Sequence, residues 1–176
     1  MTTNQLDLWE ISPADPNDSI PLYGNVAHIS DWTNWQLGDE FFPVRLFVDH
    51  KSDSLDEVMS FLAESEDFIW SDDLVPWLTQ KGAQILLSSG LTGFRLQKIL
   101  ITAVGNTSLE GAPTAKSPAL FRVDVCNEFS PTSQSTPPTD FFMALVGGKR
   151  LGITQRAKTY LEQVGWQNFY AELLLW

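Results

Sequence analysis

The sequence predicts a single α+β domain in which a few short helices pack on a mostly antiparallel or mixed β-sheet. Three observations support this. The chain has 176 residues, and chains usually divide into separate domains only beyond roughly 250 residues. Hydrophobic residues make up 43% of it, which is enough to form a core. A unit that reads as helix, glycine and strand occurs twice, so we predict one domain over residues 1–176 with a duplicated helix-glycine-strand unit.

The duplicated unit covers residues 75–101 and 150–176, which align without a gap at an offset of 75. Repeated segments of this kind indicate a repeated structural unit. The identical positions are Thr79 and Thr154, Gln80 and Gln155, Gly90 and Gly165, Phe94 and Phe169, and Leu100 and Leu175.

Each unit carries a start and a stop signal for a helix. Thr79 and Thr154 suit the N-cap, where a threonine oxygen accepts a bond from a free backbone N–H of the first turn. Gly90 and Gly165 suit the end of the helix, because glycine adopts the left-handed conformation found there without a Cβ clash. Gly82 lies inside the first helix and lowers its intrinsic stability by about 1 kcal/mol relative to alanine.

Further elements follow from capping, periodicity and composition. Residues 54–57 read Ser-Leu-Asp-Glu, a capping box that predicts a helix over 55–64. Runs of β-branched and aromatic residues predict strands, and runs rich in Ser, Thr, Pro and Gly predict loops. The predicted strands are 5–11, 43–48, 119–126 and 141–146, and the predicted loops are 103–118 and 127–138.

The chain is strongly acidic, with 22 Asp and Glu against 11 Lys and Arg and a formal net charge of −11. Residues 1–88 hold 16 of the acidic and 3 of the basic residues. Such a surface repels nucleic acid and anionic lipid, so we expect neither as a partner. Two explanations remain open, an acidic face that keeps the protein in solution and a surface that attracts a cationic partner.

A search for catalytic and metal-binding patterns returns no site, and we expect no enzyme, no metal and no cofactor. Cys126 lies in a predicted strand and suits a buried thiol, while His28 and His50 lie in different segments. The glycines before Lys149 lack the Ser or Thr of a phosphate-binding loop and suit a strand-to-helix turn. Neither an apolar span nor a signal stretch is present, so we expect a cytoplasmic protein.

The most distinctive segment is acidic and aromatic. Residues 49–73 hold nine carboxylates, and tryptophans lie in it and near it, including Trp70 and Trp77. Indole rings anchor protein interfaces, and carboxylates speed encounter with a basic partner. Because most of the seven tryptophans must lie in the core, we expect only some of them at an interface. The predicted binding residues are Trp32, Trp35, Asp49, Asp53, Asp56, Glu57, Glu64, Glu66, Asp67, Asp72 and Asp73.

The duplicated unit resembles one that is common in a family of immunity proteins from bacterial polymorphic toxin systems. The resemblance rests on the threonine cap, the basic start of the helix at Lys81, the Gly-Leu-Thr-Gly-Phe run over 90–94 and the strand that follows. The second copy departs from this pattern, because Asn168 stands where the second glycine is expected. The resemblance covers about 54 of the 176 residues and supplies no functional residues.

The resemblance implies a cytoplasmic, non-enzymatic inhibitor that binds a cognate toxin domain with a basic cleft and blocks its active site. The alternative is a small-ligand-binding domain or an enzyme with an unrecognised site, which a deep polar pocket containing His28 or His50 would favour. A third possibility is an adaptor or structural subunit with a large flat apolar patch. The sequence does not determine the oligomeric state.

Overall fold

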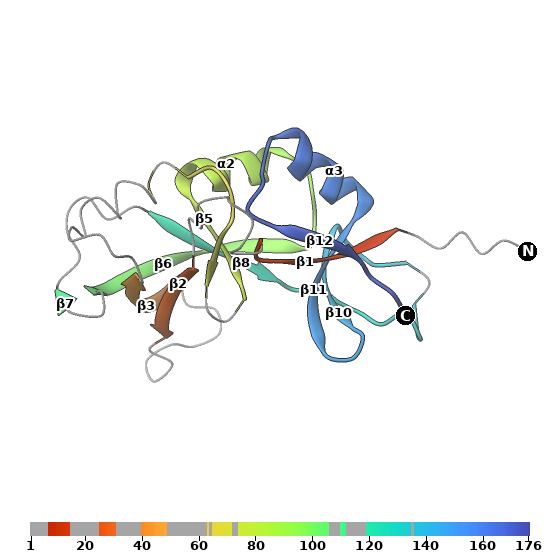
Figure 1. The fold of residues 1–176 in the computed structure, drawn as a ribbon, viewed down its shortest axis with the longest axis horizontal. Helices are drawn as coiled ribbons and strands as arrows, with labels where there is room; N and C mark the ends of the chain where they lie inside the picture. The colour runs from red at the N-terminus through yellow and green to blue at the C-terminus, as the bar shows by residue number, and fades with distance from the viewer. Residues whose placement is uncertain are drawn as a thin grey trace, which may run out of the picture.

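The computed structural model describes residues 7–14, 25–30, 40–48, 63, 65–71, 74–105, 110–111, 119–134 and 136–176. Its two mixed sheets and two helices form a single α+β fold, which confirms the predicted fold class (Figure 1). In chain order the elements are β1 (Leu8–Ser12), β2 (Asn25–Ser30), β3 (Phe41–Val48), β4 (Ile69–Ser71), β5 (Pro76–Thr79), α2 (Gln80–Ser88), β6 (Phe94–Gly105), β7 (Glu110–Gly111), β8 (Leu120–Val125), β9 (Glu128–Phe129), β10 (Phe141–Leu145), β11 (Lys149–Thr154), α3 (Gln155–Gln163) and β12 (Tyr170–Leu173).

The larger sheet closes on itself. Its strands run in the order β3-β2-β4-β5-β8-β6-β7, and β3 also pairs with β6. The first half of the twelve-residue β6 pairs with β8, and the second half pairs with β3 on the opposite side, with Lys98 paired on both sides. The result is a ring of six hydrogen-bonded strands, in which closure satisfies strand edges that would otherwise be exposed.

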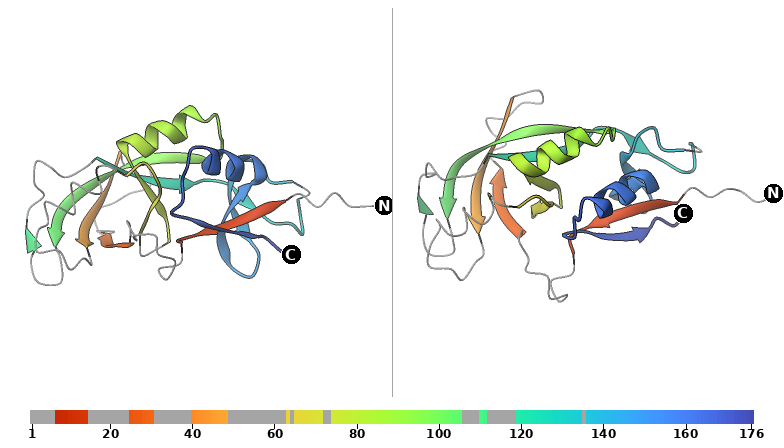
Figure 2. Two further views of the ribbon diagram at one scale, coloured as in Figure 1. Left: turned by 45° about the horizontal axis from the view of Figure 1, so that its top comes forward. Right: turned by 90° about the horizontal axis from the view of Figure 1, so that it is seen from above.

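The smaller sheet is open and has the order β12-β1-β11-β10-β9. Neighbouring strands are antiparallel except for β9 and β10, which are parallel. The ring and this sheet lie at opposite ends of the elongated molecule, and β8 runs from one toward the other (Figure 2). Among the described strands, β12 and β9 form the two edges of the smaller sheet.

The helices α2 and α3 lie next to each other on one side of both sheets (Figures 1 and 2). The Tyr160 hydroxyl of α3 donates to the Ile85 carbonyl of α2 at 3.0 Å, and these two residues occupy equivalent positions in the two units. The main core fills the space beneath the helices and contains Ile11, Phe68, Trp70, Leu78, Ala83, Leu86, Leu91, Val123, Phe141, Ile153, Ala157, Leu161 and Trp166.

The predicted helix signals are confirmed in both units. Thr79 Oγ1 accepts from the Gly82 N–H, and Thr154 Oγ1 accepts from the Ala157 N–H, each at 3.3 Å. Gly90 and Gly165 have φ of +68° and +83°, the left-handed region that favours glycine. Each unit is therefore strand, threonine cap, helix, glycine and strand.

Packing explains why glycine, despite its low helix propensity, occupies position 82 inside α2. Gly82 is buried, and a Cβ at this position would lie 2.8 Å from the carbonyl oxygen of Glu66. The absence of a side chain lets the segment before β4 pack directly against the first turn of α2. Glycine is therefore required here by packing, which the sequence pattern could not reveal.

Asp140 joins the two units beneath the helices. Its side chain is 7% exposed. Its Oδ2 accepts from the Thr92 N–H and from Arg156 Nη1, each at 3.0 Å, and its Oδ1 accepts from Thr154 Oγ1 at 2.9 Å. Arg156 also donates to the Gly90 carbonyl at 3.1 Å. The Asp140 carboxylate thus links the turn after α2 to the N-cap of α3.

The other predicted elements are confirmed in part. The strands predicted over 5–11, 43–48, 119–126 and 141–146 correspond to β1, β3, β8 and β10 with shifted ends. The helix predicted over 55–64 lies outside the described residues except for Ala63, which is helical.

The predicted loops are wrong in part, because β6 continues to Gly105 and the short strands β7 and β9 fall inside them. The glycines at 147 and 148 form a hairpin turn between β10 and β11 and not a strand-to-helix turn.

Candidate functional site

Two of the eleven predicted binding residues, Glu66 and Asp67, have described positions just before β4. The structure therefore brings these two together and leaves the grouping of the others as a prediction. The remaining nine lie outside the described residues: Trp32, Trp35, Asp49, Asp53, Asp56, Glu57, Glu64, Asp72 and Asp73.

Asp67, in the acidic segment just before β4, accepts hydrogen bonds from three backbone N–H groups. Its Oδ2 accepts from the backbone N–H of Asn168 at 2.7 Å and of Gln167 at 2.5 Å, and its Oδ1 accepts from the Phe68 N–H at 2.6 Å. Burial raises the pKa of Asp67 above 3.8, and this effect exceeds the opposing effect of the three backbone hydrogen bonds. The carboxylate is already occupied by the protein's own backbone and is poorly placed to serve as a free recognition group.

Asn168 completes this connection. Its Nδ2 donates to the Phe68 carbonyl at 2.7 Å, and its own carbonyl accepts from Trp70 Nε1 at 2.5 Å. We call Asp67, Phe68, Trp70, Gln167 and Asn168 the clasp. It fixes residues 67–70 of the acidic segment to the turn before β12.

Glu66 is exposed and remains available to a partner. The backbone around it is fixed on the other side too, because Thr79 Oγ1 donates to the Ser65 carbonyl and Gly82 contacts the Glu66 carbonyl. Glu66 therefore lies beside the first turn of α2, where the positive end of the helix dipole favours a negative charge. Among the described residues, it is the predicted binding group that could face a partner.

The described tryptophans are mostly core residues, as expected. Trp70 and Trp77 are 1% and 0% exposed and cannot anchor a partner in this conformation. Trp166 is buried, and Trp9 donates its Nε1–H to Gln155 Oε1 at 2.8 Å. Trp176 is 49% exposed. An interface role for tryptophan thus stays a prediction for Trp32 and Trp35.

Seven of the nine basic residues in the described part of the chain form ion pairs there. Some pairs are close, such as Arg150 with Glu10 at 2.7 Å and Lys149 with Glu128 at 3.0 Å. Lys81 has no such pair among the described residues. The cations with an ion-pair partner are Arg95, Lys98, Arg122, Lys149, Arg150, Arg156 and Lys158.

The excess of negative charge therefore belongs to the rest of the chain. The residues outside the described ranges carry eleven of the 22 carboxylates and two of the eleven bases. Nine of the eleven predicted binding residues fall among them, seven of which are carboxylates. These residues therefore account for −9 of the formal net charge of −11, which favours a basic partner.

A small cavity of about 120 Å³ lies between the β4–β5 turn and the β10–β11 hairpin. Its polar lining includes Arg122 and Asp124, which form an ion pair at 2.7 Å, and Leu74 at its rim has a φ of +60°. Its lining residues are Leu74, Val75, Pro76, Arg122, Val123, Asp124, Val125, Met143 and Leu151.

This cavity does not resemble an active site. Sites for small molecules usually enclose roughly 300 to 1,000 Å³ and bring several polar groups together. Neither His28 nor His50 lines this one. The enzyme or ligand alternative stays a prediction, because this cavity is not the deep polar pocket that it requires.

Cys126 is exposed and follows the end of β8, so its prediction as a buried strand residue is wrong. The β8 pattern places buried side chains at Leu120 and Val123, and the strand ends before the cysteine. His28 lies on β2, and His50 lies outside the described residues.

In the part of the chain that the structure describes, no three potential metal ligands cluster. No described helix is both long and apolar enough to cross a membrane. No protein-family model and no curated protein matches the chain.

Proposed function

We propose that this protein is an inhibitor of the immunity type, which binds a basic toxin domain through its acidic segment and blocks that domain's active site. The unequal distribution of charge carries this proposal. Seven cations of the described fold have ion-pair partners within it, and the residues of 15–73 outside the described ranges hold eleven carboxylates against one base, Lys51. An acidic excess of this size attracts a basic protein and accelerates its association.

The clasp supports this proposal structurally. It fixes residues 67 and 68 of the acidic segment on the fold. A contact surface that is fixed before binding loses less entropy when the partner binds, which favours affinity. Glu66 belongs to the binding surface in this proposal, whereas Asp67 acts as a support and is removed from the set of contact residues.

The proposal also includes the setting in which the protein works. An inhibitor that protects its own cell meets the toxin in the cytoplasm, as the resemblance of the duplicated unit implies. Inhibition by occlusion requires neither a cofactor nor a catalytic residue on this chain. The partner is a protein with a basic cleft, and the acidic chain disfavours nucleic acid and membranes as partners.

The proposal predicts a neighbouring gene that encodes a large protein with a toxic C-terminal domain, and the direct test is co-expression with that domain. We expect that domain to kill its host when expressed alone, and this chain to restore survival and to co-purify with it. No rescue and no complex would refute the proposal.

A second test asks whether the acidic segment makes the contact. The triple variant Asp53→Lys, Asp56→Lys, Glu57→Lys changes the net charge by the same amount as Asp7→Lys, Glu128→Lys, Glu162→Lys, whose three sites are exposed. We expect the first variant to slow association much more than the second at low salt. Equal effects would indicate that total charge matters and that the segment does not make the contact.

A third test concerns the aromatic anchors. Replacing Trp32 or Trp35 with alanine removes a large contact area without changing the charge. We expect faster dissociation and a nearly unchanged association rate, because affinity differences among mutants of one interface lie mostly in dissociation. If both variants dissociate like the wild type, neither tryptophan anchors the complex.

A further inference from the structure

Among the described strands, β12 is an edge strand of the smaller sheet. The larger sheet closes through the pairing of β3 with β6 and has the two-residue strand β7 outside the ring, whereas the smaller sheet is open. Its β9 edge has two residues, and Phe129 in it is buried. At the opposite end, β12 pairs with β1, and no described strand pairs with its other side. Strand edges of this kind accept extended segments of other proteins.

The hydrogen-bond register defines which groups this edge offers. The Leu174 N–H donates to the Leu8 carbonyl at 2.8 Å, so residue 174 faces β1. In an antiparallel pair the backbone groups of successive residues point to opposite sides. Glu172 therefore also faces β1, and the N–H and C=O groups of Ala171 and Leu173 point away from it, toward the free edge.

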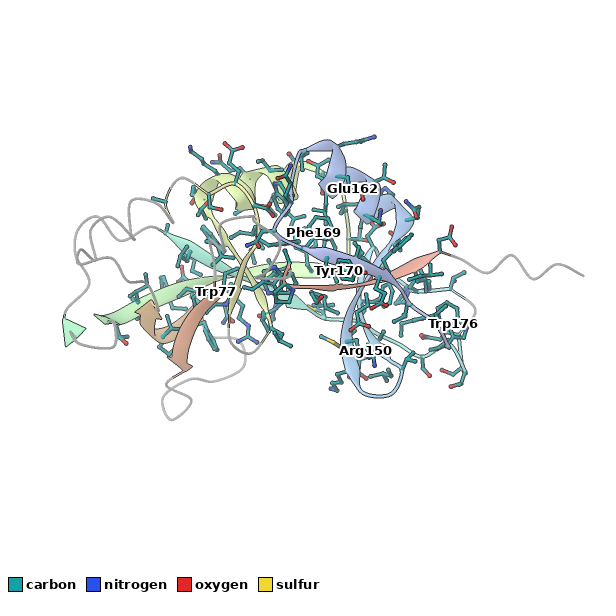
Figure 3. The ribbon with its side chains drawn as sticks, viewed as in Figure 1. Trp77, Arg150, Glu162, Phe169, Tyr170 and Trp176 are labelled. Atoms are coloured by element: carbon teal, nitrogen blue, oxygen red, sulfur yellow. The ribbon has the colours of Figure 1, made fainter. Side chains whose placement is uncertain are left out.

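The side chains at this edge are those of a contact surface. Tyr170 is 57% exposed and Leu173 is 42% exposed. In Figure 3, Tyr170 lies at the start of β12 and Trp176 beyond its end. Edge strands that avoid pairing usually carry several charges or a proline. The single charged residue of β12 is Glu172, and the strand has no proline.

Glu172 shows which chemistry a partner strand needs. In the β1–β12 register it lies directly opposite Glu10, and Glu10 already pairs with Arg150 at 2.7 Å. Like charges opposite each other are unfavourable, and the Arg150 guanidinium pairs with Glu10 and not with Glu172. Glu172 is exposed and has no described ion-pair partner. A cation on an added strand, next to Glu172, would neutralise it.

We propose that the β12 edge binds an extended segment of a protein partner, in which basic residues alternate with apolar ones. The basic residues lie beside Glu172 and the Tyr170 ring on one face, and the apolar residues lie beside Ala171 and Leu173 on the other. The segment continues the smaller sheet by one strand. This inference rests on the proposed function for the identity of the partner, the basic toxin domain.

A second copy of this chain is the less suitable occupant. Two β12 strands side by side would bring two Glu172 carboxylates together, and each chain has a net charge of −11. A basic segment is attracted both by the Glu172 carboxylate and by the net negative charge of the chain.

The test uses a synthetic peptide and the full chain, so it does not depend on finding the toxin. The probe is a blocked eight-residue peptide in which lysine alternates with valine, and the control peptide has glutamate in place of lysine. Amide hydrogen exchange and chemical shifts are followed by NMR. We expect the lysine peptide to slow exchange at Ala171 and Leu173 severalfold, with little change at Glu172 and Leu174. The glutamate peptide should have no effect.

Three controls separate strand addition from charge attraction. A lysine peptide with methylated backbone nitrogens cannot donate to the edge, and we expect it not to bind there. Leu173→Pro removes an outward N–H and spares the bonds to β1, so it should abolish the effect. Glu172→Lys should weaken binding about fivefold, as a change of about 1 kcal/mol implies, whereas Glu162→Lys, on the far side of the sheet, should not.

Protection at 171 and 173 that is lost with the methylated peptide supports the proposal. No protection, equal binding of both peptides, or shifts confined to the acidic segment would overturn it. Protection that grows with protein concentration in the absence of peptide would indicate a dimer and overturn it as well. Failure of the rescue experiment refutes the proposed function, and failure of the peptide experiment alone refutes this edge and leaves that function standing.

Discussion

The two copies of the duplicated unit begin in the same way and end differently. Thr79 and Thr154 cap their helices through the same atom at the same distance, and Gly90 and Gly165 both have positive φ. Three residues later the first unit has Gly93 with a φ of +96°, whereas the second has Asn168 in a conformation open to any residue. The two units thus share the residues that begin and end their helices, but they differ in the turn that leads into the following strand.

The difference has a tertiary cause. A Cβ on Gly93 would lie 2.1 Å from the Phe141 carbonyl, because β10 passes directly beside this turn. At the equivalent position of the second unit, the Asn168 side chain donates to the Phe68 carbonyl. Asn168 therefore has a structural role of its own at the position where the first unit has Gly93. Each unit has the residue that its different neighbour requires.

The largest expected effect comes from Gly93→Ala. The clash with a backbone oxygen and the positive φ together should lower the free energy of unfolding by more than about 3 kcal/mol, as measured by urea unfolding. The control is Gly165→Ala, whose Cβ would meet no atom within 4 Å and which should lose about 1 kcal/mol. Similar losses at both sites would mean that the conformation alone, and not the neighbour, requires glycine.

The next effect should come from Asp140→Ala, which removes the carboxylate that links the two units. We expect a loss of about 2 to 3 kcal/mol, since Thr92 and Thr154 lose their acceptor beneath the helices. Glu128→Ala, which breaks the exposed pair with Lys149, should lose less than about 1 kcal/mol. A loss at Asp140 no larger than that at Glu128 would show that the link contributes little.

Gly82→Ala and Ala157→Gly exchange the residues of the two helices. Helix propensity alone predicts that the first stabilises and the second destabilises, each by about 1 kcal/mol. Because a Cβ at 82 would lie 2.8 Å from the Glu66 carbonyl, we expect both to destabilise, by about 1 to 2 kcal/mol. Urea unfolding distinguishes the two cases, and a stabilised Gly82→Ala variant would contradict the packing argument.

The smallest effect is the pH dependence that Asp67 introduces. Its pKa is raised above 3.8 in the folded protein, so the folded state keeps this proton to a higher pH than the unfolded chain does. The stability from this proton is fully present below pH 3.8 and is lost as the pH rises through the folded-state pKa.

Unfolding of the wild type and of Asp67→Asn between pH 3 and 7 checks this sign. The wild type should lose stability relative to the variant as the pH rises through that window, and the difference should then level off. An NMR titration of the Asp67 carboxyl carbon with a pKa below 3.8 would reverse the expected slope and refute the interpretation.

Parts of the fold could be predicted because they depend on neighbours in the sequence. The helix caps, the glycine stops and the strands near β1, β3, β8 and β10 follow from residues a few positions apart. The strands β2, β4, β5 and β11 were not predicted, and the sequence pattern could not predict that the larger sheet closes into a ring. That closure depends on the pairing of Phe41 with Lys98, which are far apart in the chain.

The candidate site divides in the same way. Composition alone revealed the acidic excess, but it did not distinguish Asp67 from Glu66, although they are adjacent. Asp67 is occupied by the backbone of residues about 100 positions away, and Glu66 is exposed. The free edge of β12 had no sequence signal, because an edge is defined by the strand that does not pair with it.

The sequence by itself determined the α+β class, the two capped helices and the acidic balance of the chain, because hydrophobic pattern, capping and charge are local or additive properties. Tertiary structure decided why Gly82 and Gly93 must be glycine, what Asp67, Asp140 and Asn168 bind, and which strand edge stays open. The physical reason is that steric clash, buried hydrogen bonds and strand pairing each need a second group, and only the fold brings that group within a few ångströms.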